Sequence, residues 1–371
     1  MTVRPLLDEH VGQLTLIDNH VHGYWRSGVD RVRFENGLNE ANTEPLAGFD
    51  SGFDTQLGFA LRTHCATLIG LEAHAGPQAY WERRSTFTEA ELARIFLPAA
   101  GVSDWLVDTG LPGVAGPPEI AGASGALAHE ILRLEQIAEQ AAARPGDYAA
   151  NFREILTGRA ASAIATKTVL AYRGGFPGDL SEPTEPEVAI AARRWRDDGA
   201  TRLADRVLLR FGIHQALRLG KPLQFHVGLG DRDCDLHRTN PMYLLDLLRE
   251  SGETPIVLLH CYPYEREAGY LAQAFNNVYL DIGLSTNHLG ARAAAFLGSS
   301  LELAPFRKIL YSSDAFGPPE LHYLGSRLWR DGIAEVLSGF VDRSQWCIDD
   351  ALRVAGLIGR DNAARLYRLP A

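Results

Sequence analysis

The chain has 371 residues, with 36 Lys and Arg against 46 Asp and Glu, and a formal net charge of −10. An acidic chain offers no basic surface that would neutralise phosphates, so we expect no nucleic-acid partner. No apolar run approaches the roughly 18 residues that span a bilayer, which argues against a membrane-integral role. The length exceeds the usual single-domain range, but an α/β barrel with insertions reaches it as one domain over 1–371.

Cysteine usage and the first residues bear on the cellular compartment. Cys65, Cys234, Cys261 and Cys347 are scattered without the CxxC spacing of metal or redox motifs. The first residues do not combine a basic region, an apolar stretch and a cleavage site, which is the pattern of a secretory signal. The sequence therefore predicts a protein of the reducing cytoplasm.

Strand-like apolar runs alternate with helical patterns along the chain, which is typical of a parallel sheet built from βα units. Eight runs qualify, over 14–19, 102–108, 130–135, 163–172, 222–227, 255–260, 277–282 and 308–313. Amphipathic segments long enough for crossover helices separate the last several of them. The second and third runs are also compatible with partly helical structure. The pattern favours a distorted (β/α)8 TIM barrel.

Two segments fall outside this alternation. Residues 24–100 are too many for a βα loop, whose usual length is about 2–6 residues. Their helical patterns and aromatic residues predict a mostly helical insertion after the first strand, capping the barrel mouth. The tail 342–371 predicts two packed helices, the second beginning at Gly359 or Arg360.

Two histidines one residue apart, His20 and His22, follow the first apolar run. Side chains at positions i and i+2 of a strand point to the same side, so both imidazoles are placed to bind one metal ion. His226, His260 and Asp314 end three other strand-like runs. One such histidine alone is more often a hydrogen-bonded core residue. Because the carboxyl ends of barrel strands open on one face, we expect all five to form a single cluster.

The donor types in this cluster suit a divalent cation. Imidazole nitrogens from His20, His22 and His226 and the carboxylate of Asp314 fit Zn²⁺ best, with Mn²⁺ or Fe²⁺ as alternatives. A bound ion of this kind lowers the pKa of its water to about 7. We expect Asp314 to accept a proton as well as bind the metal. We expect His260 to polarise the substrate or protonate the leaving group.

Lys167, in the fourth run, bears on the number of metal ions. A carboxylated lysine that points into the barrel would bridge two metals. The early position of Lys167 in its run favours a structural role instead. The sequence leaves one or two ions open.

Four further residues are candidates for binding a small-molecule substrate: Arg173, Tyr262, Glu320 and Trp25. Arg173 ends the fourth run, where a guanidinium is placed to hold a carboxylate through two hydrogen bonds. A surface ion pair is an equally good reading of Arg173. Tyr262 follows the sixth run and Glu320 the eighth. Trp25 follows the histidine pair and suits either an apolar pocket wall or core packing.

Several long motifs resemble a known group of proteins. These are LIDNHVHG, QFHVGLGDRDCDLHRTNP, IVLLHCYPYEREAGYLAQAFNNVYLDIGLS and ILYSSDAFGPPELHYLGSRLWR. They resemble the amidohydrolase superfamily, more narrowly the amidohydrolase half of FluG-type and nodulin-like proteins, which carry it fused to a glutamine-synthetase-like domain. The likeness is strongest over 163–330 and weakest over 24–100. It implies a distorted TIM barrel with a divalent metal, usually zinc, and a strand-six histidine that binds a second metal or acts on the substrate.

Three functions remain open at this point. The first is metal-dependent hydrolysis of an amide or other C–N bond in a small carboxylate-bearing substrate, with a γ-glutamyl amide as the specific candidate. The second is non-oxidative decarboxylation, since a related branch of the superfamily resembles this ligand set. The third is a barrel that has lost catalysis and serves as a binding or scaffold module. The sequence also leaves open whether copies of the chain pair into a homo-oligomer.

Overall fold

The computed structural model describes residues 3–42, 44–48, 50–199 and 201–369. Its centre is an eight-stranded parallel sheet in which the strands neighbour one another in chain order, from β1 to β8. The strands are β1 (Leu16–Val21), β2 (Val102–Asp108), β3 (Leu127–Arg133), β4 (Ala165–Thr168), β5 (Leu223–Val227), β6 (Ile256–His260), β7 (Val278–Asp281) and β8 (Ile309–Leu310). Each matches a predicted apolar run, so the predicted (β/α)8 TIM barrel is confirmed.

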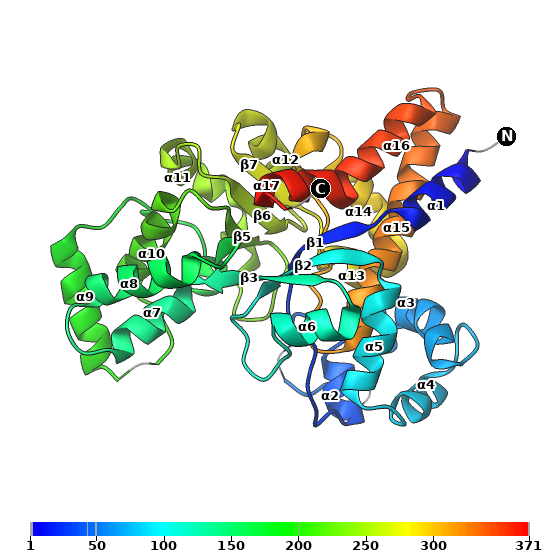
Figure 1. Ribbon diagram of the computed structural model, residues 1–371, viewed down its shortest axis with the longest axis horizontal. Coiled ribbons are helices and arrows are strands. Elements are labelled where there is room, and N and C mark those ends of the chain that lie inside the picture. Colours follow the sequence, from blue (N-terminus) through cyan, green and yellow to red (C-terminus); the bar gives the residue numbers. More distant parts are fainter. Residues whose placement is uncertain (1–2, 43, 49, 200, 370–371) are drawn as a thin grey trace.

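Helices surround this sheet (Figure 1). They are α1 (Arg4–Gln13), α2 (Arg31–Asn36), α3 (Gln56–His64), α4 (Pro77–Arg84), α5 (Glu89–Ala99), α6 (Pro117–Ser124), α7 (Leu134–Ala143), α8 (Tyr148–Ala160), α9 (Glu185–Asp197), α10 (Arg206–Arg218), α11 (Leu245–Glu250), α12 (Glu265–Ala274), α13 (Ser285–Leu289), α14 (Ala293–Ser300), α15 (Pro319–Asp342), α16 (Ile348–Gly356) and α17 (Asn362–Tyr367). None of the helices in the described part of the chain combines the length and apolar character that crossing a bilayer requires.

Backbone hydrogen bonds close the barrel between its first and last strands. Asn19 N donates to Tyr311 O at 3.1 Å, and Asp314 N donates to His20 O at 3.0 Å. One step further along, His22 N donates to Ala315 O at 2.9 Å. We call this line of contacts the β1–β8 seam. It sets the backbone of His20 directly beside that of Asp314.

The inside of the barrel is apolar below its open rim. A buried cluster fills it with side chains from alternate strand positions: Ile17, Leu106, Ile131, Ala165, Val257, Leu259 and Leu310. The helix α17 seals the other end, because Ala363, Leu366 and Tyr367 belong to the same cluster. Branched and aliphatic residues of this kind pack the interior of TIM barrels.

The predicted 24–100 insertion holds four helices, α2 to α5. Figure 1 shows them gathered on one side of the barrel in blue and cyan, near the long helix α15. Both α3 and α5 pack against α15, which lies at the side of the barrel. The part that lies over the barrel mouth is α2 and the turn after it, which line the cavity described below. Residues 43 and 49 of the insertion lie outside the described residues.

The two helices predicted for the tail correspond to α16 and α17, and the predicted start of the second, Gly359 or Arg360, falls in the segment that joins them. The helix α16 continues into a π-helical segment, Leu357–Asp361, and then into α17, which begins at Asn362. Ile358 O accepts a hydrogen bond from Tyr311 N at 3.2 Å, so this wider turn docks onto the strand-eight region. Gly359 leaves room there, because a Cβ would lie 2.8 Å from the Trp329 ring and 2.9 Å from Leu16. Residues 370 and 371 lie outside the described part.

A buried ion-pair cluster joins the insertion to α15. Arg84, at the end of α4, is 1% exposed and places Nε 2.7 Å from Glu320 Oε1. The same guanidinium places Nη2 2.8 Å from Glu89 Oε2, at the start of α5. One cation thus holds two carboxylates from different elements, and all three side chains are buried.

We expect Arg84→Met to lower the free energy of unfolding by about 3–5 kcal/mol, because it leaves two buried carboxylates without their cation. Urea unfolding followed by circular dichroism measures the change. Arg353→Met is the matched control, since Arg353 pairs with Asp350 at 2.8 Å where both side chains are 54% exposed. That control should change stability little. Equal stability of the Arg84 variant and the wild type would show that the cluster does not anchor the insertion.

Candidate metal centre

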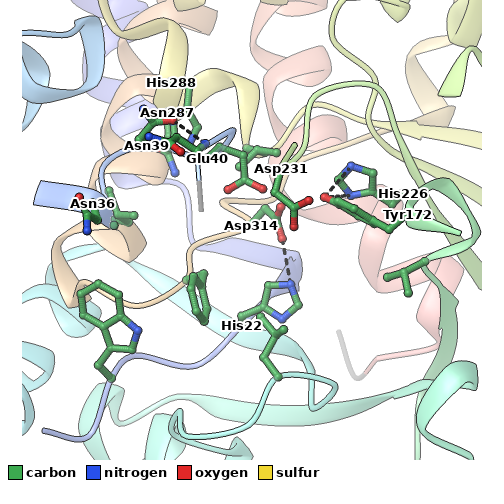
Figure 2. A pocket seen from close by; sticks show the side chains of 18 of the residues that line it. His22, Asn36, Asn39, Glu40, Tyr172, His226, Asp231, Asn287, His288 and Asp314 are labelled. Carbon is green, nitrogen blue, oxygen red and sulfur yellow. Dashed lines mark hydrogen bonds and ion pairs between the residues drawn. The ribbon is translucent and has the colours of Figure 1, made fainter. Parts of the chain in front are cut away.

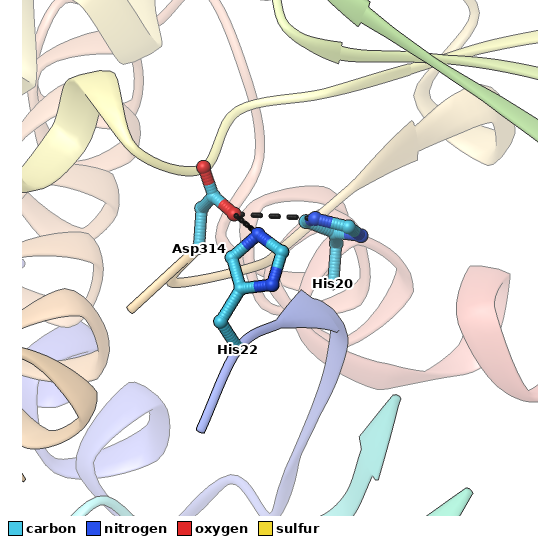
Figure 3. Close-up of side chains that lie close together, drawn as sticks. All are labelled: His20, His22 and Asp314. Carbon is cyan, nitrogen blue, oxygen red and sulfur yellow. Dashed lines mark ion pairs between the residues drawn. The ribbon is translucent and has the colours of Figure 1, made fainter. Parts of the chain in front are cut away.

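The end of β1 and the segment after β8 bring three ligand-type side chains together. His20 Nε2 lies 3.2 Å and His22 Nε2 lies 3.5 Å from Asp314 Oδ1. One ligand atom from each of these buried residues lies within 4.8 Å of the other two. Figure 3 shows both imidazoles turned towards the carboxylate. The sequence-predicted core of the cluster is therefore assembled at the rim of the barrel.

Outer hydrogen bonds fix which nitrogen of each imidazole is free. Gln224 on β5 donates its amide hydrogens to Asn19 O at 3.0 Å and Tyr367 Oη at 2.8 Å. Its amide oxygen therefore accepts the Nδ1–H of His20, at 2.8 Å. His22 Nδ1 donates in the same way to the carbonyl oxygen that ends β2, at 3.2 Å. In both rings Nε2 is left with its lone pair, the arrangement typical of metal-binding histidines.

His260, at the end of β6, lies on the other side of the carboxylate. Its Nε2 is 3.2 Å from Asp314 Oδ2, and its Nδ1 is 3.7 Å from Asp281 Oδ1. The ring is fully buried, and neither nitrogen has a hydrogen-bond partner among the described residues. A buried polar atom without a partner is costly, so both nitrogens are suited to a ligand or to proton transfer.

Lys167 lies in the cluster rather than in a structural position. Its Nζ is 3.0 Å from His20 Nε2 and 3.1 Å from Asp108 Oδ2. Asp108 ends β2 and also accepts from Arg133 Nη2 at 2.7 Å. Burial opposes ionisation of Asp108, but Arg133 and Lys167 hold its pKa well below the usual value. Three charged side chains in contact, Lys167, Asp108 and Arg133, therefore lie beside the histidine pair.

His226, the fourth predicted ligand, lies beside the cluster. Its ring centroid is 4.8 Å from that of His260. Its Nε2, however, is 3.1 Å from the hydroxyl of Tyr172, which follows β4. The group whose ligand atoms lie within 4.8 Å of one another contains His20, His22 and Asp314 but not His226. The ligand role of His226 stays a prediction.

The protonation of these residues suits a cation. Burial lowers the pKa of His22 and of His226 to about 3, so both rings are neutral at physiological pH. Burial opposes ionisation of Asp314, but His260 and His20 hold its pKa well below the usual value. Neutral imidazoles and an ionised carboxylate are the forms that bind Zn²⁺ and related ions. The residues present therefore fit one divalent metal held by His20, His22 and Asp314.

Two of the residues have unusual backbone conformations. His260 has a φ of 68° and Asp314 a φ of 46°, in the left-handed region that side chains with a Cβ rarely adopt. Each such residue costs about 1–3 kcal/mol and is retained only where the surrounding structure enforces it. Both conformations occur where a strand-six or strand-eight segment turns at the barrel rim. They aim the two side chains at each other across the site.

A cavity of about 690 Å³ opens beside the candidate metal ligands His22 and Asp314. Its walls include His22, Trp25, Lys167, Arg173, His226 and Asp314. Figure 2 shows two more carboxylates, Glu40 and Asp231, which turn towards Asp314 from the insertion and from the loop after β5. Burial, with Asp314 and Asp231 nearby, raises the pKa of Glu40 to about 8. The volume suits a small molecule.

Two of the four predicted substrate-binding residues line this cavity. Trp25 packs edge-to-face on Phe316 at 6.1 Å, and the Arg33 guanidinium lies 4.6 Å above its ring. Arg173 donates from Nε to Leu203 O at 2.7 Å and from Nη1 to Tyr172 O at 3.1 Å. No hydrogen bond of its Nη2 is found among the described residues.

The other two do not line it. Tyr262 packs on Phe296 at 6.0 Å, and its carbonyl accepts from Leu229 N at 2.7 Å, so it supports the loop after β5. Glu320 is fully buried in the ion pair with Arg84. Its position in the first turn of α15 points it at the insertion rather than at the cavity, and this corrects its expected contact with substrate.

The sequence analysis misplaced Lys167 and missed three other residues of the site, namely Asp108, Glu40 and Tyr172. Lys167 was placed early in a run taken as 163–172, but β4 is only Ala165–Thr168, so Lys167 is its penultimate residue. Asp108 ends β2 and carries the same polar-terminus pattern as Asp314, and that pattern would have identified it. Glu40 and Tyr172 come from irregular segments, where no periodicity marks a cavity residue.

Comparison with family models adds evidence to this geometry. The chain matches the Amidohydrolase family model over residues 136–369, well over half of its length, and it belongs to that family. It is 35% identical over 221 residues to the protein fluG of Emericella nidulans. That match covers 56% of the chain and 26% of fluG, so the chain spans about a quarter of this relative. The family resemblance inferred from the motifs is confirmed.

Solved structures agree on the fold. A protein from Lactobacillus casei, provisionally described as a metal-dependent hydrolase, superposes with a TM-score of 0.81 at 27% identity, covering 98% of this chain and 97% of that one. A uronate isomerase from Bacillus halodurans has a TM-score of 0.68 at 15% identity, covering 99% and 96%. The second likeness shows a shared fold alone.

His322 on α15 supports the backbone just after β1. Its Nε2 donates to His22 O at 3.0 Å, and its side chain is fully buried. Burial lowers the pKa of His322 from 6.5 to about 4. The folded protein therefore keeps this ring neutral at pH values where an unfolded chain protonates it.

His322→Gln should make the metal-free protein less sensitive to acid. As the pH falls from 6.5 towards 4, the unfolded wild type takes up a proton at His322 that the folded state refuses, so stability is lost. Over this pH range, the free energy of unfolding of the variant should fall by up to about 3 kcal/mol less than that of the wild type. Urea unfolding between pH 4.5 and 7.5 measures it, with His237→Gln, whose side chain is 75% exposed, as control. Identical pH profiles for wild type and His322→Gln would refute the assignment.

Proposed function

We propose that the protein is a metal-dependent hydrolase that cleaves an amide or other C–N bond of a small carboxylate-bearing substrate. The observation that carries this proposal is the donor set itself. Two imidazoles turn Nε2 towards one side of the Asp314 carboxylate, and His260 faces the other side. Of these residues, His22 and Asp314 line a cavity of small-molecule size. The family membership and the provisional description of the Lactobacillus casei protein support the same class.

A divalent ion at this site would supply a Lewis acid that polarises a carbonyl oxygen and lowers the pKa of a water molecule. The remaining chemistry belongs to the side chains. Asp314 is held ionised, so it accepts a proton at neutral pH. Because Oδ1 and Oδ2 face different histidines, it is placed to take the proton on one side of the substrate and deliver it to the departing nitrogen on the other. His260 orients this carboxylate from 3.2 Å.

Cationic side chains on the cavity wall support an anionic substrate. Arg173 and Lys167 both line it, and Arg173 Nη2 is directed to no hydrogen-bond partner among the described residues. A guanidinium that is already fixed through Nε and Nη1 loses little freedom when it binds a carboxylate. We assign the substrate carboxylate to Arg173.

The specific candidate is a γ-glutamyl amide. It follows from the resemblance to FluG-type proteins, whose amidohydrolase half is fused to a glutamine-synthetase-like domain. Such a substrate carries a carboxylate for Arg173 and a scissile C–N bond several atoms away. Non-oxidative decarboxylation is the competing reaction, because the Arg173 clamp would serve it equally well. The two differ in product, since hydrolysis releases an amine and decarboxylation releases CO₂.

Asp314→Asn should abolish turnover while most of the metal stays bound, because the amide keeps an oxygen donor but cannot accept the proton. We expect kcat to fall by at least about 100-fold. Amine release from a panel of γ-glutamyl amides and metal content by mass spectrometry measure both effects, with Asp246→Asn, 90% exposed on α11, as control.

Three results would count against parts of this proposal. A normal kcat in Asp314→Asn would refute the proton-transfer role. Release of CO₂ without amine from carboxylate substrates would establish the decarboxylase. A wild-type protein that cannot be loaded with zinc, manganese or iron would favour a scaffold barrel.

A further inference from the structure

Two aromatic residues, Trp25 and Phe316, lie beside the candidate metal ligands, and we call them the aromatic pair. The β1–β8 seam continues to them, because Trp25 N donates to Gly317 O at 2.9 Å. The Phe316 ring centroid is 6.2 Å from that of His22 and 6.1 Å from that of Trp25, edge-to-face in both cases. Phe316 is partly exposed and lines the cavity. An aromatic surface thus begins directly next to the metal centre.

Other apolar side chains line the same part of the cavity. Val32, on α2, is 59% exposed, and Leu111, after β2, is partly exposed. Both segments reach Trp25. Gly37, at the end of α2, lies so close to the Trp25 ring that a Cβ would collide with it, and Val114 forms a β-bridge with Trp25. The aromatic pair is therefore the centre of an apolar part of the cavity wall.

Arg173 lies across the cavity from the aromatic pair. It follows β4 whereas Phe316 follows β8, and these strands are four apart in a closed barrel of eight. Figure 2 shows Tyr172, next to Arg173 in the chain, and Asn36, on α2, on opposite sides of Asp314. The metal centre thus lies between a cationic part of the wall and an apolar one.

We propose that the aromatic pair binds the amine half of the substrate, and that this half is apolar. The inference rests on the proposed function, in which Arg173 holds the carboxylate and the scissile C–N bond lies at the metal centre. A substrate that extends from Arg173 across the centre places the substituent of its amide nitrogen against Phe316. Hydrolysis then leaves the carboxylic acid on the Arg173 side and the free amine on the aromatic side.

Burial of the nitrogen substituent favours an alkyl or aryl group. The free energy gained is proportional to the apolar area removed from water, and a single methyl group covers little of the surface formed by Val32, Leu111 and Phe316. The substrate class is therefore a carboxylate-bearing amide of a larger alkyl amine or an aryl amine.

The charged residues near Trp25 do not favour a cationic amine. Asp30 caps α2, since its Oδ1 accepts from Arg33 N at 2.8 Å. The Arg33 guanidinium lies 4.6 Å above the Trp25 ring and donates from Nη1 to Ser27 O and Gly28 O, each at 3.0 Å. An ammonium group at the end of the amine half would approach this fixed guanidinium and be repelled by it.

A pair of γ-glutamyl amides, the methylamide and the butylamide, tests the proposal. The two amines have similar basicity, so the amides differ mainly in three methylene groups. We expect kcat/KM of the zinc-loaded, full-length protein to be about 10- to 50-fold higher for the butylamide, as burial of those groups implies. The 4-aminobutylamide, which adds a terminal ammonium group, should be a poorer substrate than the butylamide.

Phe316→Ala should lower the butyl-to-methyl ratio to about 3-fold or less, because it removes most of the aromatic surface. The measurement is a ratio, so a general loss of activity cancels. Phe316→Leu should keep most of the preference. Val32→Ser, at an exposed position of the wall, should lower the ratio by about 2-fold and decides the matter where Phe316→Ala does not fold. Phe59→Ala is the matched control, since Phe59 is 51% exposed on α3 and is not among the residues lining the cavity.

Calorimetric binding of the same amides separates this proposal from the hydrolase. Hydrolysis without a butyl preference, with a preference that survives Phe316→Ala, or with the 4-aminobutylamide as the best substrate overturns the apolar subsite and leaves the hydrolase standing. Butyl-selective binding that Phe316→Ala removes, without any C–N cleavage, supports the subsite and overturns the hydrolase. A protein that neither binds nor cleaves the amides overturns both.

Discussion

The closure of the barrel between β1 and β8 is the constraint on which the site depends. Asp314 donates its backbone N–H to His20 O at 3.0 Å, and His22 donates to Ala315 O at 2.9 Å. These bonds bring residues almost 300 positions apart in the chain to neighbouring backbone positions. Side chains that share a seam need only point the same way to share a ligand. The apolar filling of the barrel, which holds the strands in register, therefore also sets the spacing of the donors.

Packing and charge also determine the orientation and the protonation of the side chains that barrel closure brings together. The left-handed backbones of His260 and Asp314 are unfavourable alone, and they persist because the surrounding strands and loops leave no alternative. Burial keeps His22 and His226 neutral, while His260 and His20 hold the pKa of Asp314 well below its usual value. Lys167 and Arg133 both pair with Asp108 at one edge, whereas burial raises the pKa of Glu40 to about 8 at another and so opposes its ionisation.

The sequence was sufficient for the barrel and for the residues that end its strands. Apolar runs mark buried strands, and a polar residue at the end of such a run marks the rim, which is why His20, His22, His260 and Asp314 were found. Lys167 was misplaced because the run containing it continues past the true end of β4. Glu320 was misjudged because its orientation depends on how the insertion packs on α15. Contacts of that kind, like the one between Tyr172 and His226, depend on tertiary packing, which periodicity does not encode.

The helix α17 links the far end of the barrel to the metal centre. Tyr367 Oη donates to Asn19 Oδ1 at 3.0 Å and accepts from Gln224 Nε2 at 2.8 Å, and Gln224 in turn fixes the ring of His20. The ribosome makes this helix after all eight strands. A nascent chain whose strands have already emerged still lacks the hydroxyl that orients Gln224. The orientation of the His20 ring therefore depends on a helix that is synthesised after every strand of the barrel.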